Sequence, residues 1–156
     1  MPANTEGTMQ DKTPRMGRQD VAKSQDGLKP ALTLPVRWSA PFFNSSGYAS
    51  EAINFILPIA DRLELGISHN SSIWSEPFIN DLPPSTRETL HQLQGHNTTI
   101  NGGIFISHKP GFAFKRPPDA VYHIGRTMFE TDRLPANWVA ACNQMDEIWV
   151  PSRFNA

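Results

Sequence analysis

Apolar positions along this chain follow two patterns, short continuous runs and longer stretches with helical spacing. The short runs predict five strands, at residues 36–40, 65–68, 103–108, 120–125 and 147–150. The clearest helical stretch places apolar side chains on one face at Ile53, Ile56, Leu57, Ala60 and Leu63. Because apolar strands that alternate with amphipathic helices favour a parallel sheet, we predict an α/β fold with helices on both faces of the sheet.

Polar residues and prolines predict where the helices begin and end. Ser50 is predicted to cap the first helix, with Glu51 near its positive N-terminal end. Pro58 interrupts that helix and predicts a kink or an early end, because an interior proline removes a hydrogen bond. Residues 71–84 contain three prolines and are predicted to be irregular.

Residues typical of helix N-termini predict two further helices. Residues 85–88 fit a capping box, which predicts a short helix to about Gln94 with Gly95 as terminator. Asp132 or a neighbour is predicted to start the last helix, with Pro135 in its first turn, where a missing N–H costs little.

The first 33 residues differ in composition from the rest of the chain. They contain no aromatic residue and few aliphatic ones, and they are rich in Lys, Asp, Gln, Thr, Pro and Gly. Such a segment buries too little apolar surface to offset its chain entropy. We therefore predict a disordered tail at 1–33 and one ordered domain at 34–156.

Charge and composition exclude several classes of function. A net charge of -1 gives no electrostatic basis for nucleic-acid binding. No apolar run approaches the ~18 residues that span a bilayer, and the N-terminus lacks a signal-peptide core, which favours a cytoplasmic location. The one cysteine, Cys142, excludes an internal disulfide and a cysteine-based zinc site, and is predicted to be a small buried hydrophobe.

In an open parallel sheet, ligands bind outside the carboxyl ends of the strands. After the first strand comes the loop 44–48, where Gly47 and the N–H groups of the next helix are suited to a phosphate, or form an ordinary turn. After the third strand comes His108, which is suited to proton exchange or to donation to a hydroxyl, or is a structural histidine bonded to nearby backbone.

Several charged residues follow the fourth predicted strand. Arg126 and Arg133 are suited to a phosphate or a carboxylate, and Glu130 and Asp132 to accepting hydroxyl groups or to proton transfer. The alternative is an internal network of these arginines and carboxylates. The sequence contains no P-loop, nucleophile elbow, dinucleotide fingerprint or helical pair of metal-binding histidines, and we predict no metal site.

Two segments resemble a known family in the same order along the chain. They are residues 38–51, which run from Trp38 to Glu51, and residues 129–155, which include Phe129–Pro135 and Met145–Ser152. Both are similar to sugar-nucleotide-dependent glycosyltransferases of the group 1, family 4 type, which have the GT-B fold. The resemblance implies that 34–156 is a Rossmann-like N-terminal glycosyltransferase domain, truncated at its C-terminal end.

The resemblance also implies roles for individual residues. Ser46, Gly47 and Tyr48 would form the loop that approaches the donor phosphates, although relatives often have two adjacent glycines there and this chain has one. His108 and Glu130 would be the catalytic residues. The substrate-binding residues would be Arg126, Thr131 and Asp132.

The implied activity is retaining transfer of a hexosyl group from a nucleotide sugar to an acceptor hydroxyl. The nucleotide sugar is a substrate, and neither a cofactor nor a metal is implied. Nothing in the chain resembles the donor-binding domain, so this acceptor-side portion is expected to be inactive alone. The alternative is a non-catalytic Rossmann-like module that binds a sugar or a protein. As a half-fold, the chain is expected to expose an apolar face.

Overall fold

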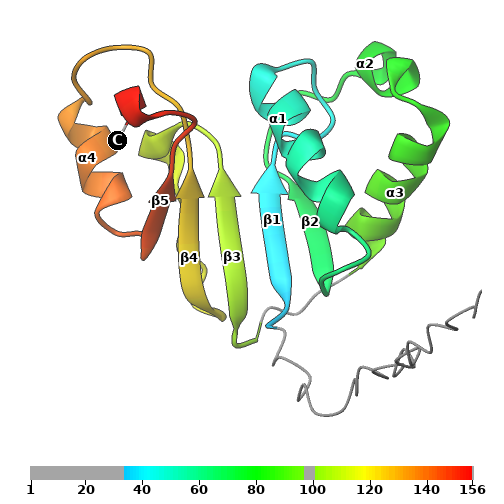
Figure 1. Cartoon of the computed structure of the whole chain (residues 1–156), viewed down its shortest axis with the longest axis horizontal. Coiled ribbons are helices and arrows are strands. Elements are labelled where there is room, and N and C mark those ends of the chain that lie inside the picture. The colour runs from blue at the N-terminus through cyan, green and yellow to red at the C-terminus, as the bar shows by residue number, and fades with distance from the viewer. Residues whose placement is uncertain (1–33, 97–100, 156) are drawn as a thin grey trace, which may run out of the picture. The chain divides into compact units, whose positions relative to one another are not determined.

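The computed structural model describes residues 34–96 and 101–155 (Figure 1). The predicted disordered tail, residues 1–33, lies outside the described residues. The strands are β1 (Val36–Ala40), β2 (Leu65–His69), β3 (Gly103–His108), β4 (Ala120–Arg126) and β5 (Glu147–Trp149). The α-helices are α1 (Gly47–Ile56), α2 (Glu76–Asp81), α3 (Pro84–Gly95) and α4 (Ala136–Cys142). Short 3-10 helices lie at η1 (Leu57–Ile59), η2 (Gly111–Ala113) and η3 (Arg153–Asn155).

The five strands form one sheet in the order β2-β1-β3-β4-β5, and every pairing is parallel. All five strands therefore end at the same edge of the sheet (Figure 1). This arrangement confirms the predicted α/β class, and the fold is Rossmann-like. The predicted strands match the observed ones to within one or two residues.

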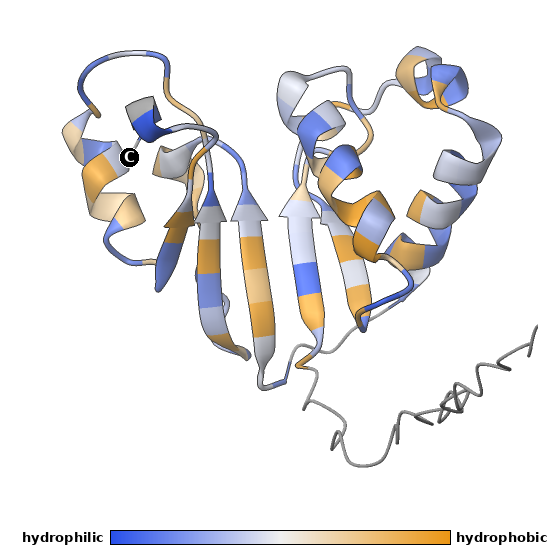
Figure 2. Ribbon diagram, in the orientation of Figure 1, coloured by the Kyte–Doolittle hydropathy of each residue, from blue (hydrophilic) through white to orange (hydrophobic). Residues whose placement is uncertain are grey.

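The main core lies on the face of the sheet that α1 covers. The register pairs Trp38 with Ile67 and Ile106, and Ile106 with Ile124, so these four side chains project to the same face. All four are buried, and Ile53 and Ile56 of α1 join them in one cluster. Figure 2 shows hydrophobic segments along both the strands and α1. Burial of this cluster is the main hydrophobic contribution to the fold.

The opposite face is covered near β4 and β5 by η2 and α4. A side-chain carbon placed on Gly125 would lie 2.5 Å from the ring of Phe114, which follows η2. Gly111 of η2 packs in the same way against Trp138 and Cys142 of α4. Helices therefore lie on both faces, as the sequence pattern predicts.

The start of α1 differs from the prediction. Its N-cap is Ser46, whose hydroxyl accepts a hydrogen bond from the Ala49 N–H at 3.2 Å, so the prediction of Ser50 was wrong. Asn44 stabilises this cap, because its side-chain oxygen accepts from both the N–H and the hydroxyl of Ser46. The predicted early end is confirmed, since α1 stops at Ile56 and Pro58 lies in the following 3-10 turn.

The other helices also differ from the prediction. Helix α2 lies within 71–84, where no helix was predicted, and Ser75 caps it by accepting from the Phe78 N–H. Helix α3 begins at Pro84, so the capping box at 85–88 was wrong, but it ends at Gly95. Helix α4 begins after Pro135 rather than near Asp132. In these three helices a proline occupies the first turn or the cap.

Among the described residues, no helix is both long enough and apolar enough to cross a membrane.

Gly125 tests the close packing between the sheet and its η2 side. We expect Gly125→Ala to lower the free energy of unfolding by about 1–3 kcal/mol, because the new methyl group would contact Phe114 and Ile148 inside 3 Å. Gly95→Ala is the matched control, since its methyl group would meet no atom within 4 Å. Urea unfolding followed by tryptophan fluorescence measures both. Equal midpoints for the two variants would contradict the packing described.

Candidate functional site

Three charged or titratable side chains meet at the carboxyl edge of the sheet, and we call them the Glu51 cluster. Glu51 lies on α1, His108 ends β3 and Arg126 ends β4. The His108 Nε2 atom lies 2.8 Å from a Glu51 carboxylate oxygen, and the Arg126 guanidinium donates to the other oxygen. The side chain of His108 is fully buried and that of Arg126 is 3% exposed, whereas that of Glu51 is 23% exposed.

The hydrogen bonds of His108 fix its tautomer. The indole N–H of Trp38 donates to the Nδ1 atom of His108 at 3.2 Å, so this nitrogen carries no proton. The proton of the neutral ring is therefore on Nε2, which donates it to Glu51. Burial lowers the pKa of His108 from 6.5 to about 4, although the hydrogen bond and the charge of Glu51 oppose the shift. His108 is thus neutral near pH 7, with both ring nitrogens in use.

Arg126 is held by the protein on several sides. Its guanidinium donates to the carbonyl oxygens of Thr127 and Trp149 at 3.2 and 3.1 Å, in addition to Glu51. It also lies 5.6 Å from the centre of the Phe55 ring, within the range of a cation–π contact. Its Nε atom is buried without a hydrogen-bond partner. Arg126 is therefore anchored inside the fold, with its charge compensated by Glu51.

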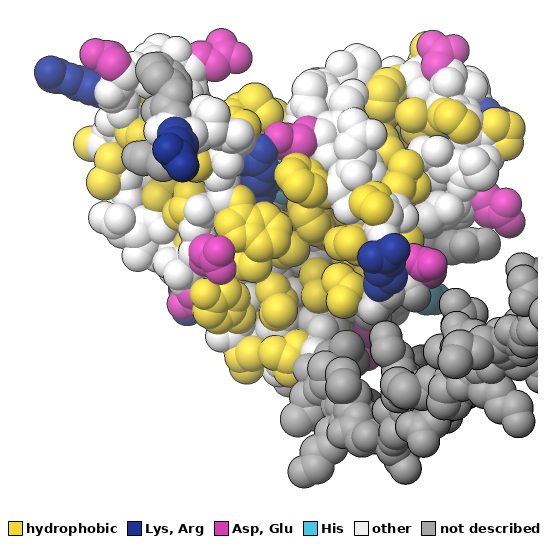
Figure 3. Space-filling model, viewed as in Figure 1, with side chains coloured by type: hydrophobic (Ala, Val, Ile, Leu, Met, Phe, Trp, Pro, Cys, Tyr) yellow, Lys and Arg dark blue, Asp and Glu magenta, His cyan; other side chains and the backbone are white. Residues whose placement is uncertain are grey.

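A hollow of about 430 Å³ lies beside the cluster and is lined by Glu51, Asn54 and Phe55. Phe55 is 41% exposed, and its ring stacks on Trp38 with 5.7 Å between ring centres. Figure 3 shows acidic and basic side chains gathered among hydrophobic ones beside α1. A carboxylate next to exposed apolar surface suits a ligand that carries both hydroxyl groups and apolar faces.

The predicted phosphate loop lies next to the cluster. The Tyr48 hydroxyl is 3.3 Å from the Thr127 hydroxyl and donates to the Met128 carbonyl at 3.3 Å, and its ring meets that of His108 edge-on. Gly47 is exposed, and a side-chain carbon added there would meet nothing within 4 Å. The structure therefore brings Tyr48, His108 and Arg126 together, with Ser46 and Gly47 at the adjoining open start of α1.

Three predicted residues, Glu130, Thr131 and Asp132, lie apart from the cluster. All three are exposed on the segment between β4 and α4, and the Thr131 hydroxyl donates to the Arg133 carbonyl. Within the described residues, none of them forms a hydrogen bond or an ion pair with the Glu51 cluster. The alternative network of arginines with Glu130 and Asp132 is also not formed, because Arg126 pairs with Glu51 instead.

Glu51 is the site residue that sequence reasoning missed. The sequence pattern assigned it only a favourable position near the start of α1. Its partners are 57 and 75 residues away along the chain. The available signal was its place one turn before Phe55, on the same side of α1.

A second charged group serves the structure rather than the site. Asp146 accepts from the backbone N–H of His123 at 2.8 Å and contacts its ring at 3.2 Å. The backbone hydrogen bond, together with Arg116, holds the pKa of Asp146 below its usual value. Across 34–96 and 101–155, no three His, Cys, Asp or Glu side chains are placed to hold a metal ion.

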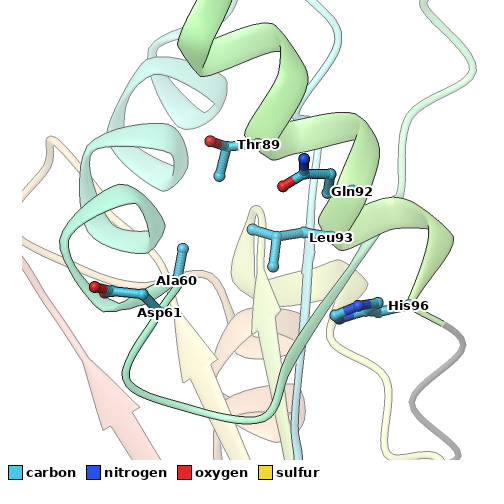
Figure 4. Close-up of a pocket in the computed structure, with 6 residues that line it drawn as sticks. All are labelled: Ala60, Asp61, Thr89, Gln92, Leu93 and His96. Carbon is cyan, nitrogen blue, oxygen red and sulfur yellow. The ribbon is translucent and has the colours of Figure 1, made fainter.

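A hollow of about 370 Å³ lies between η1 and α3 (Figure 4). It is lined by Ala60, Asp61, Thr89, Gln92, Leu93 and His96. It adjoins the end of α1 and the start of β2, so it lies at the amino edge of the sheet. Since ligands of open parallel sheets bind at the carboxyl edge, the Glu51 cluster is the better candidate site.

The chain matches no protein-family model, no curated protein and no solved structure in the three comparisons made.

The buried neutral His108 makes stability depend on pH. Between about pH 6.5 and 4, the unfolded chain binds a proton at His108 that the folded chain does not, so the free energy of unfolding falls as pH falls. The loss should approach about 3 kcal/mol near pH 4. We expect His108→Gln to flatten this part of a urea-unfolding profile measured from pH 7 to 4.5. The exposed control His91→Gln should retain the slope. Equal slopes in all three proteins would show that His108 is not the cause.

Glu51 should be more important for stability than an exposed glutamate. We expect Glu51→Gln to reduce the free energy of unfolding by about 3 kcal/mol, because it leaves the buried charge of Arg126 uncompensated. Glu88→Gln, on the exposed face of α3, is the control and should change it by less than about 0.5 kcal/mol. Chemical denaturation at pH 7 measures the difference. A loss below 1 kcal/mol for Glu51→Gln would contradict the pairing.

Proposed function

We propose that this chain is the acceptor-side portion of a retaining glycosyltransferase. In this proposal the complete enzyme moves a hexosyl group from a nucleotide sugar to a hydroxyl acceptor, and this portion alone transfers little or no sugar. The observation that carries the proposal is the position of the Glu51 cluster. It lies at the carboxyl edge of a parallel sheet, directly beside the open start of α1.

The open start of α1 supports the donor side of the proposal. A helix N-terminus offers unpaired N–H groups and a positive partial charge, both of which favour phosphate. Gly47 leaves space for a close approach, and Tyr48 is held in place by its contacts with Thr127 and Met128. The donor diphosphate would approach at Ser46, Gly47 and Tyr48.

Glu51 supports the proposed contact with the sugar. A carboxylate offers about four lone-pair sites. His108 uses one on one Glu51 oxygen, and Arg126 uses one on the other. The remaining sites are open to hydroxyl groups of a sugar in the hollow beside Phe55. In this arrangement His108 and Arg126 act as positioning residues, because they are buried and hold Glu51 in one orientation. The exposed residues Glu130, Thr131 and Asp132 would contact the acceptor.

The second candidate function is a non-catalytic module that binds a sugar or a protein. It is favoured by the full use of both ring nitrogens of His108, which leaves this histidine without a free nitrogen to act as a general base. Exposed apolar residues on the sheet and on α1, among them Val121, Tyr122 and Phe55, also suit a binding surface.

Saturation-transfer NMR with the purified chain tests the proposal. The ligands are uridine, guanosine and adenosine diphosphate hexoses, the matching free nucleotides, and free hexoses. We expect millimolar binding of nucleotide sugars and hexoses, and an at least fivefold weakening by Asn54→Trp, which fills the hollow. Asn80→Trp, at an exposed position of α2, is the matched control and should bind like the wild type.

Three outcomes separate the candidates. Absence of binding by every nucleotide sugar and hexose would overturn both sugar-binding candidates. Binding of hexoses without any binding of nucleotides or nucleotide sugars would favour the non-catalytic module. Turnover of a nucleotide sugar by this chain at an enzyme-like rate would overturn the expectation that it is inactive alone.

A further inference from the structure

An apolar pocket of about 300 Å³ lies between α4 and β5, near the carboxyl edge of the sheet. Its apolar walls are Phe129, Leu134, Cys142, Ile148 and Val150. Thr127 and Asn155 are its polar residues. Binding pockets are typically lined by apolar side chains with a few polar groups that orient the ligand, and this pocket has that composition.

Specific contacts connect the segments that form the walls of this pocket. The Phe129 ring packs against Trp138 of α4, with 4.7 Å between ring centres. The Asn155 side-chain amide donates to the Phe129 carbonyl, and its oxygen accepts from the Ser152 hydroxyl at 3.0 Å. The pocket is therefore built from tied segments rather than from loosely placed side chains.

The pocket adjoins the Glu51 site through one residue, Thr127. Its hydroxyl meets that of Tyr48, and its backbone N–H donates to the Trp149 carbonyl at 3.1 Å. Two of the pocket walls, Phe129 and Leu134, flank the exposed residues 130–132 that would contact the acceptor. A ligand held by that segment would therefore have an apolar surface next to its polar one.

We propose that this pocket takes the apolar portion, an alkyl chain, of the hydroxyl acceptor. The inference rests on the proposed glycosyltransferase function and names its acceptor class as amphiphilic. An engineered apolar cavity of about 150 Å³ holds benzene, so a pocket twice that volume accommodates a short alkyl chain. Each buried methylene should tighten binding about fourfold.

Cys142 provides a reporter inside the pocket, because it is the single cysteine of the chain. The experiment measures its rate of alkylation by iodoacetamide in the full chain. Octyl glucoside, methyl glucoside and octanol are added separately, each below the concentration at which it self-associates. We expect octyl glucoside to slow alkylation at least fivefold, octanol to do so more weakly, and methyl glucoside to have no effect.

Two leucine variants test whether the protection of Cys142 arises from binding in the pocket. Leu134→Ala should reduce the protection by octyl glucoside several-fold, because it removes an apolar wall. Leu63→Ala is the matched control, since Leu63 is exposed to a similar extent, 38% against 43%, and lies outside the pocket. Both positions are partly exposed, so both variants should remain folded, which circular dichroism checks.

Each other outcome overturns the inference in a defined way. If octyl glucoside gives no protection, the pocket does not take an alkyl chain. If octanol protects as well as octyl glucoside, the pocket binds apolar groups but is not part of an acceptor site. In either case the NMR measurement of nucleotide-sugar binding is unaffected, so failure of this inference is distinct from failure of the proposed function.

Discussion

The burial of one positive charge, that of Arg126, is the constraint on which the arrangement of this domain depends. A guanidinium that is 3% exposed requires a counter-charge and hydrogen-bond acceptors, because an unpaired charge in the interior is strongly destabilising. Glu51 supplies the counter-charge from α1, and the carbonyl groups of Thr127 and Trp149 supply the remaining acceptors. This pairing holds α1 against the ends of β3 and β4 and so places the start of α1 at the candidate site.

The charge balance of the cluster also explains why His108 is neutral. Glu51 and Arg126 together carry no net charge, so a proton on His108 would add an uncompensated charge to a buried site. Desolvation outweighs the favourable contribution of Glu51, and the pKa of His108 falls to about 4. The neutral ring then links Trp38 in the core to Glu51 at the surface of the hollow. A fixed link of this kind orients Glu51 before any ligand binds, which reduces the entropy lost on binding.

The sequence pattern predicted the strands and the parallel sheet because those features depend on local apolar runs. It also predicted the effect of Pro58, since the loss of an N–H acts within one turn. The helix starts were predicted less well: Ser46 and Ser50 are both plausible caps, and the hydrogen bonds that Ser46 donates to the Asn44 side chain favour Ser46. The residues of the site were predicted in part, because His108 and Arg126 end strands. Glu51 was missed because its role depends on partners that are distant in sequence and adjacent only in the folded sheet.

The end of β4 connects the two parts of the candidate site through the alternation of a strand. Successive side chains of a strand point to opposite faces, so Gly125 faces η2 while Arg126 faces α1. Thr127 follows, and it both contacts Tyr48 and lines the apolar pocket. A shift of one residue in the register of β4 would place Arg126 against Phe114 and remove it from Glu51. The close contact at Gly125 opposes such a shift, because only a residue without a side chain fits there. The packing of Gly125 on one face of the sheet thereby stabilises the Arg126–Glu51 pair on the other face. It also keeps Thr127 in place between the polar hollow and the apolar pocket.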